Sequence, residues 1–78
     1  MARIRTLDQG TQNVRPHTSE VDCFYQIVHG PRNERLLHLT TFGSDSRESA
    51  PKSSQSIQVD RAIAEQLMEV LRKTFPGL

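Results

Sequence analysis

The stretch that decides the fold is Asp60-Arg-Ala-Ile-Ala-Glu-Gln-Leu-Met-Glu-Val-Leu-Arg-Lys-Thr-Phe75. Its apolar residues recur every three or four positions and so share one side of a helix: Ile63, Ala64, Leu67, Met68, Val70, Leu71 and Phe75. Asp60 suits the N-cap position, and Pro76-Gly77 ends the periodic run. The sequence therefore predicts an amphipathic helix from Asp60 to Phe75 that packs on another layer.

The residues before this helix have the pattern of strands. Val21 to His29 is rich in aromatic and β-branched residues, and Arg35 to Phe42 returns after the turn at Gly30-Pro-Arg-Asn33, so the two segments predict a hairpin. Ser56-Ile-Gln-Val59 predicts a short strand that leads into the helix, and the alternation in Arg3-Ile-Arg-Thr-Leu7 predicts a first strand. We expect an α+β fold, with a four-stranded antiparallel sheet followed by one C-terminal amphipathic helix (ββββα).

The register of the hairpin has two alternatives, and a slip of one residue exchanges the two faces of a strand. Pairing His29 with Glu34 would bring a mixed set beside Tyr25: Leu36, His38, Thr40 and Phe42. Pairing His29 with Arg35 would instead bring Leu37, Leu39 and Thr41 to that face. We favour the second register, because it joins Leu37 and Leu39 to the apolar residues Val21, Cys23, Tyr25 and Ile27. The other face then carries Phe24, His38, Thr40 and Phe42.

The length of 78 residues predicts one domain over residues 1–78. Residues 1–18 form an N-terminal strand and loop with two alternatives, an edge strand of the sheet or an arm that is mobile as a whole. Residues 43–55 form a long polar loop rich in serine. An apolar share of 35% in so short a chain makes a small core, so homodimerisation is expected. The single cysteine excludes an intramolecular disulfide, and neither a signal sequence nor a membrane span is found. We expect a cytoplasmic protein.

Catalytic and metal sites are not expected. No pair of cysteines or histidines has metal-ligand spacing, and Cys23 falls mid-strand, where we expect a small buried side chain. Glu20 and Asp22 are best explained as a solvated strand entrance. Asp45, Glu48 and Lys52 are residue types found in metal-dependent nucleases, but they fall within one predicted loop. We therefore predict no enzyme activity, no cofactor and no metal.

A nucleic-acid site is the stronger hypothesis, although the net charge is only +1. Eight of the ten basic residues are arginine, which favours planar contacts. Aromatic side chains on the open face of the sheet would stack with unpaired bases, and basic side chains would contact phosphates. The alternative is that the phenylalanines belong to the core. The predicted nucleic-acid-binding residues are Arg3, Arg5, Phe24, Arg35, His38, Phe42, Arg47 and Lys52.

The order of these segments resembles a known family. Glu34-Arg-Leu-Leu-His-Leu-Thr-Thr-Phe42, a polar loop with Pro51-Lys52, and Gln55-Ser-Ile-Gln-Val-Asp60 before a terminal helix are similar to the core of the positive-cofactor-four-like transcriptional coactivators and their small bacterial relatives. The resemblance covers residues 19–75. It implies a homodimer through the C-terminal helix and binding of single-stranded DNA or RNA on the sheet. The family's usual tryptophan and basic cluster are missing here.

Three functions follow from the sequence, in decreasing order of preference. The first is sequence-tolerant binding of single-stranded nucleic acid, related to transcription, with a marked dependence on salt. The second is a small protein-interaction or regulatory module that binds no nucleic acid. The third is a small hydrolase or nuclease.

Overall fold

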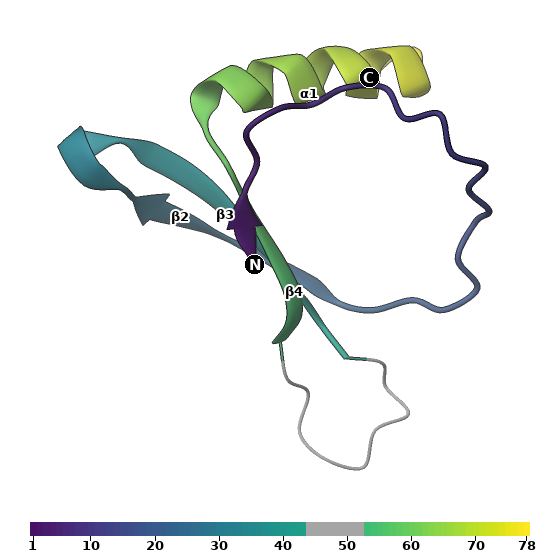
Figure 1. Ribbon diagram of the computed structural model, residues 1–78, viewed down its shortest axis with the longest axis horizontal. Helices are drawn as coiled ribbons and strands as arrows, with labels where there is room; N and C mark the ends of the chain where they lie inside the picture. Colours follow the sequence, from purple (N-terminus) through teal and green to yellow (C-terminus); the bar gives the residue numbers. More distant parts are fainter. Residues whose placement is uncertain (44–52) are drawn as a thin grey trace.

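The computed structural model describes residues 1–43 and 53–78. Four strands form one sheet in the order β1-β4-β3-β2, and one helix follows them (Figure 1). The elements are β1 (Ala2–Arg3), β2 (Cys23–His29), β3 (Arg35–Phe42), β4 (Ser53–Val59) and α1 (Arg61–Thr74). The protein is thus a small α+β fold with a C-terminal helix, as predicted. Within the described ranges, no helix is both long and apolar enough to cross a membrane.

The hairpin of β2 and β3 has the favoured register. His29 lies opposite Arg35, so Tyr25 faces Leu39 and Ile27 faces Leu37 across the antiparallel pair. The turn between them is a short 3-10 segment, Pro31–Asn33, in which Arg32 and Asn33 have φ values of 60° and 59°. On its other side β3 pairs antiparallel with β4, and the register is irregular between Thr41 and Phe42.

The first strand differs from the prediction. We expected a strand from Arg3 to Leu7 in an antiparallel sheet, whereas β1 is only Ala2–Arg3 and runs parallel to β4, with Ala2 opposite Ile57. The sheet is therefore mixed. A parallel pair needs a long connection, and here an extended arm, β2 and β3 all intervene between β1 and β4. This arm passes beside α1 and then swings out widely before it reaches β2 (Figure 1).

The last strand is longer than predicted, because β4 begins at Ser53 and not at Ser56. The end of the predicted 43–55 loop therefore belongs to the sheet, paired with β3 at Thr41 and Phe42. The rest of that loop, including Arg47 and Lys52, lies outside the described residues.

The passage from β4 into α1 follows the sequence closely. Asp60 is extended and caps the helix, since its Oδ1 accepts a hydrogen bond of 2.9 Å from the Ile63 backbone N–H. Val59 before the cap is only 2% exposed and Ile63 after it only 4% exposed. Arg72 and Lys73 occupy the last turn, where positive charge suits the helix dipole. The predicted helix is confirmed to within one residue at each end.

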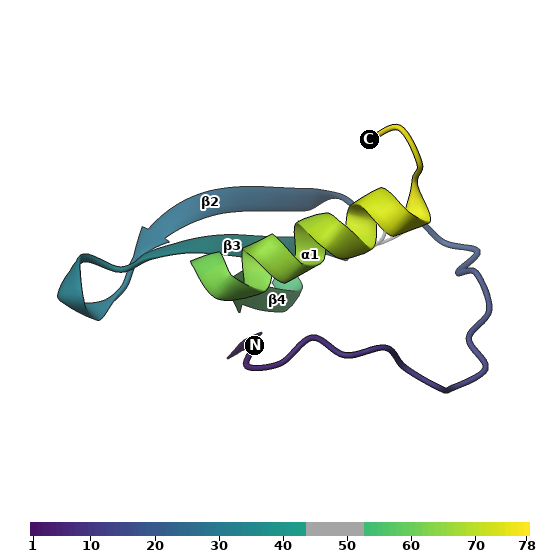
Figure 2. The same ribbon diagram turned by 90° about the horizontal axis from the view of Figure 1, so that it is seen from above.

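The helix covers only part of the sheet. Ile63 is the only buried residue of α1, so the predicted packing of the helix on the sheet is confirmed only at the helix start. Seen from above, α1 overlies β3 and β4, and β2 lies beyond it (Figure 2). The face of the sheet on which α1 lies is called the helix side. Because side chains alternate along a strand, Val59, Leu37 and Ile27 share the helix side. Tyr25 lies on the same side of β2, yet Ile27 and Tyr25 are 62% and 73% exposed. The favoured register thus brings the apolar residues to one face as predicted, but Tyr25 and Ile27 on that face are not buried, since α1 does not reach them.

Cys23 is also exposed, which contradicts the prediction of a buried thiol. It lies on the helix side of β2 like Tyr25, opposite Thr41 on β3. The buried residues among those described are Val59 and Ile63 at the helix start and Leu36 on the opposite face. Leu36 packs near Gly30, where an added Cβ would lie 3.6 Å from Leu36 Cδ1.

Candidate nucleic-acid interface

The face of the sheet that points away from α1 is called the open face. It is formed by the even-numbered residues of β2, β3 and β4, because Phe24 pairs with Thr40 and Thr40 with Ser56. Two rows of side chains cross the three strands on this face: Gln26–His38–Gln58 and Phe24–Thr40–Ser56. These six residues carry no formal charge with the histidine neutral. The open face is thus an aromatic and amide surface.

The aromatic part of the open face is a pair of phenylalanines from neighbouring strands. The ring centroids of Phe24 and Phe42 are 5.0 Å apart, with an angle of 52° between the planes. Tilted pairs at this separation are favourable. Phe42 is half-buried, whereas Phe24 is 58% exposed. Phe42 therefore supports the ring of Phe24, and Phe24 presents an accessible surface on which a base can stack.

The amide row lies beside this aromatic pair. Gln58 Nε2 lies 3.1 Å from His38 Nδ1 across the β3–β4 pair. When the amide donates, Nδ1 accepts and the imidazole proton is on Nε2. Gln26 is exposed at the other end of the row, on β2. The row thus offers hydrogen-bond donors and acceptors of the kind that pair with the edges of bases.

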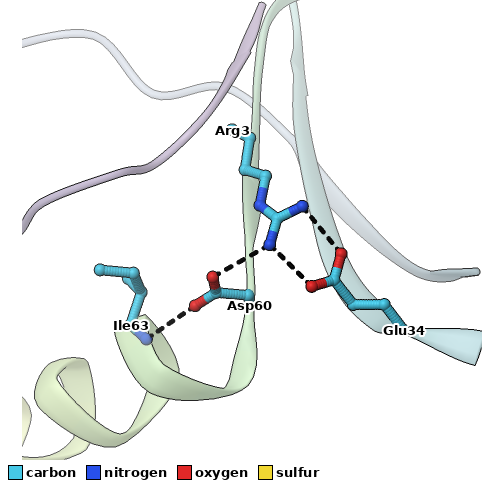
Figure 3. A network of polar contacts seen from close by, with 4 residues as sticks. All are labelled: Arg3, Glu34, Asp60 and Ile63. Atoms are coloured by element: carbon cyan, nitrogen blue, oxygen red, sulfur yellow. Dashed lines mark hydrogen bonds and ion pairs between the residues drawn. The ribbon is translucent and has the colours of Figure 1, made fainter. Parts of the chain in front are cut away.

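Arg3 forms a network at the edge of the sheet where β1 meets β4 (Figure 3). Its Nη1 and Nη2 each donate a hydrogen bond of 2.8 Å to the Glu34 carboxylate, and Nη2 also donates one of 3.1 Å to Asp60 Oδ2. Such a bidentate pair fixes the geometry of both groups. The network therefore ties β1 to the β2–β3 turn and to the cap of α1.

The charges in this network act on each other's protonation. The pKa of Asp60 is lowered, first by the hydrogen bond from the Ile63 backbone N–H and then by the Arg3 guanidinium. The pKa of Arg3 is raised, first by Glu34 and then by Asp60. Both shifts favour the charged forms. Arg3 is thus engaged with two carboxylates of the same chain.

The other predicted basic residues are not gathered on the open face. Arg35 is odd-numbered and belongs to the helix side of β3, opposite His29. Arg5 follows β1 and lines an open hollow with Thr6 and Asp60. Arg47 and Lys52 fall outside the described ranges. The structure therefore brings together the three predicted stacking residues, Phe24, His38 and Phe42. Among the described residues, it does not gather the predicted phosphate contacts Arg3, Arg5 and Arg35 beside them.

Gln26 and Gln58 were not among the predicted residues, although the sequence contained a signal for both. The favoured hairpin register already placed Gln26 beside His38. Gln58 alternates with Ile57 and Val59 in the predicted strand, but its place beside His38 comes from the pairing of β3 with β4. No group of three potential metal-binding side chains lies close together within residues 1–43 and 53–78. The site is thus described by stacking and hydrogen bonding alone.

Comparisons with protein-family models, characterised proteins and solved structures find no match to this chain. The likeness in layout to the positive-cofactor-four-like coactivators therefore stays an expectation from the sequence. The geometry of the open face is the basis on which a function can be inferred.

Proposed function

We propose that the open face binds single-stranded nucleic acid with little preference for sequence. The observation that carries this proposal is the exposed ring of Phe24, supported by Phe42 and bordered by the row Gln26–His38–Gln58. Stacking on an aromatic ring tolerates every base, since each base has a π-face. The amide and imidazole groups beside the ring would contact the edges of the same unpaired bases. A role related to transcription is suggested only by the resemblance in layout.

The charge pattern supports binding through bases more than through phosphates. Among the described residues, Arg3 is paired with Glu34 and Asp60, and Arg35 belongs to the helix side. Each neutralised phosphate on a single strand contributes about −0.7 to the slope of log K against log salt. Arg5 is the one predicted phosphate contact that remains among the described residues, so we expect a slope of about −0.7 from them. A steeper slope would come from Arg47 and Lys52, which the double variant Arg47→Ala with Lys52→Ala would measure.

The direct test is the binding of a fluorescent single-stranded oligonucleotide, followed by anisotropy at low salt. Phe24→Ala removes the accessible ring. Because the Phe24 side chain is 58% exposed, its loss should disturb the fold little. At about 1–3 kcal/mol per stacked base, the dissociation constant should rise about five- to 150-fold. A duplex of the same sequence should bind more weakly, because its bases are already stacked.

The matched control is Val14→Ala, since Val14 is an apolar side chain that is 73% exposed but lies in the arm between β1 and β2. It should bind the oligonucleotide like the wild-type chain. Absence of binding at low salt, or equal weakening by the two variants, would exclude the open face as a nucleic-acid site. The protein-interaction module would be favoured instead if the chain purifies with a stoichiometric protein partner and without nucleic acid, which an excess of absorbance at 260 nm over 280 nm would reveal.

We also infer that the protein is a homodimer in which α1 takes part. At 100° per residue, Met68, Leu71 and Phe75 lie on the same side of α1 as Ala64. Ala64 lines an open apolar groove of about 250 Å³ together with Ile27 and Leu37. Met68 and Phe75 are 49% and 58% exposed. A second copy would cover these side chains, and sedimentation would measure the assembly in solution.

A further inference from the structure

β2 is an edge strand whose outer side has no neighbour in the described sheet. The Gly30 N–H donates to the Glu34 carbonyl, and the Phe42 N–H donates to the Asp22 carbonyl, so these pairs are hydrogen-bonded pairs of the hairpin. Because such pairs alternate, the even residues of β2 direct their N–H and C=O groups toward β3. The N–H and C=O groups of its odd residues point outward: Cys23, Tyr25, Ile27 and His29.

Among the described residues, this outer edge lacks the features that usually protect an edge strand. Natural edges are protected by charged side chains, proline, bulges or a covering segment, and the sequence Cys23-Phe-Tyr-Gln-Ile-Val-His29 contains no lysine, arginine, carboxylate or proline. Phe24, Tyr25 and Ile27 are all more than half exposed. The other edge of the sheet is a two-residue strand pinned by Arg3. The unprotected edge is therefore that of β2.

The exposed area of the chain is large for its mass. It exposes 7476 Å², whereas a compact protein of 8.9 kDa would expose about 4800 Å². The extended arm accounts for part of the difference. A standard interface buries about 800 Å² per partner, so the chain has enough exposed area for one.

We propose that β2 pairs antiparallel with β2 of a second copy of this chain, about a two-fold axis at Gln26. The proposal rests on the homodimer inferred above and specifies how the two copies join. A two-fold contact must use the same surface on both copies, and an uncharged edge is self-complementary because no like charges meet across it. A partner of opposite charge has nothing to recognise along this strand.

The axis at Gln26 follows from the hydrogen-bond pattern. Gln26 is the middle residue of β2, so this register alone overlaps all seven residues of both strands. It pairs Tyr25 with the partner's Ile27, and Cys23 with the partner's His29, which joins every outward N–H and C=O group. Tyrosine against isoleucine is a favourable cross-strand pair, and Phe24 would meet the partner's Val28 on the open face.

The arrangement also accounts for the exposed side of α1. An antiparallel two-fold pair keeps the helix side of both copies on one face of a continuous sheet. The groove between Ala64 and Ile27 borders β2, so both helices would turn this side toward the shared strands. The open faces would likewise join into one surface twice as wide, with Phe24 and the partner's Phe24 on either side of the axis.

Cysteine cross-linking tests the register directly. In a Cys23→Ser background, Gln26→Cys places two thiols opposite each other at a non-hydrogen-bonded pair, where Cα atoms are about 4.5 Å apart and a disulfide can form. Mild oxidation should convert most of this variant to a covalent dimer on a non-reducing gel. Gln66→Cys in the same background is the matched control, because Gln66 is exposed on the polar side of α1. It should stay largely monomeric on the same gel.

Sedimentation separates this proposal from the homodimer on which it rests. Tyr25→Lys changes an exposed side chain, so the circular dichroism should be unchanged while the dimer dissociation constant rises at least tenfold. A monomeric wild-type chain would overturn both inferences. A dimer in which Gln26→Cys fails to cross-link, or cross-links no more than Gln66→Cys, would overturn the β2 pairing alone. Larger open assemblies, or a dimer that Tyr25→Lys leaves intact, would also overturn it.

Discussion

β2 and β4 both have seven residues and both pair with β3, yet they differ sharply in burial. β2 has five apolar residues in Cys-Phe-Tyr-Gln-Ile-Val-His and β4 has two in Ser-Ser-Gln-Ser-Ile-Gln-Val. The more apolar strand is the exposed one, since only Val28 of β2 is even half-buried. The more polar strand contains Val59, which is 2% exposed.

This difference shows that apolar content does not decide burial within the single chain. Val59 is buried because the chain turns at Asp60 and lays Ile63 over the end of β4. β2 is separated from α1 by β3, and no other described segment packs on its outer edge. A strand richer in apolar residues than the buried one, but left exposed, is what a subunit contact requires.

The sharpest test of this contrast replaces one isoleucine from each region. Ile63→Ala removes a side chain that is 4% exposed and should cost about 2–5 kcal/mol of folding free energy. Ile27→Ala removes one that is 62% exposed and should cost less than about 0.5 kcal/mol in the monomer. Urea denaturation, at a concentration where the chain is monomeric, measures both. Equal losses would mean that β2 belongs to the same core as the helix start.

The second test uses acid, which acts on the corner between β4 and α1 and not on β2. The pKa of Asp60 is lowered in the folded chain, by the Ile63 N–H first and by Arg3 second. The charged carboxylate therefore stabilises the fold above its unfolded pKa of about 3.9, and this contribution is lost as the pH falls through the lower folded value.

Asp60→Asn should isolate that contribution. Asparagine is also a good N-cap, so its side chain can still accept the hydrogen bond from the Ile63 N–H. It carries no charge opposite Arg3 at any pH. The melting temperature of Asp60→Asn should therefore lie below that of the wild-type chain at neutral pH, and the two should converge in acid. Glu69→Gln on the exposed side of α1 is the control. A difference that is the same at every pH would argue against the ionic part of the network.

Much of the fold could be predicted from the sequence because its signals are local. The helix from Asp60, the hairpin register and the common face of Phe24, His38 and Phe42 all follow from periodicity and one turn. The same register could have excluded Arg35 from that face, since it is odd-numbered like Tyr25, and could have added Gln26. Gln58 joins the face through the pairing of β4 with β3, which the hairpin register does not fix.

The rest depends on contacts between distant segments, which no local pattern encodes. β1 takes its place beside β4 through the contacts of Arg3 with Glu34 and Asp60, which are 31 and 57 positions away. The exposure of Cys23, Tyr25 and Ile27 depends on how far α1 reaches across the sheet. A pattern of alternating apolar residues indicates which side chains share a face, but not whether anything covers it.

The smallest effect is expected in the turn that joins β2 to β3, which holds β2 in the sheet. Arg32 and Asn33 both have left-handed backbone angles, a conformation that costs an ordinary residue about 1–2 kcal/mol and asparagine less. Arg32→Gly removes this cost but frees the unfolded chain, which offsets about 0.4–1 kcal/mol of the gain. The net change should be a stabilisation of about 0.5 kcal/mol in thermal unfolding, whereas Asn33→Gly, the matched control, should gain nothing. A loss of stability with Arg32→Gly would show that the arginine side chain supports the turn, and that β2 is held by more than its pairing with β3.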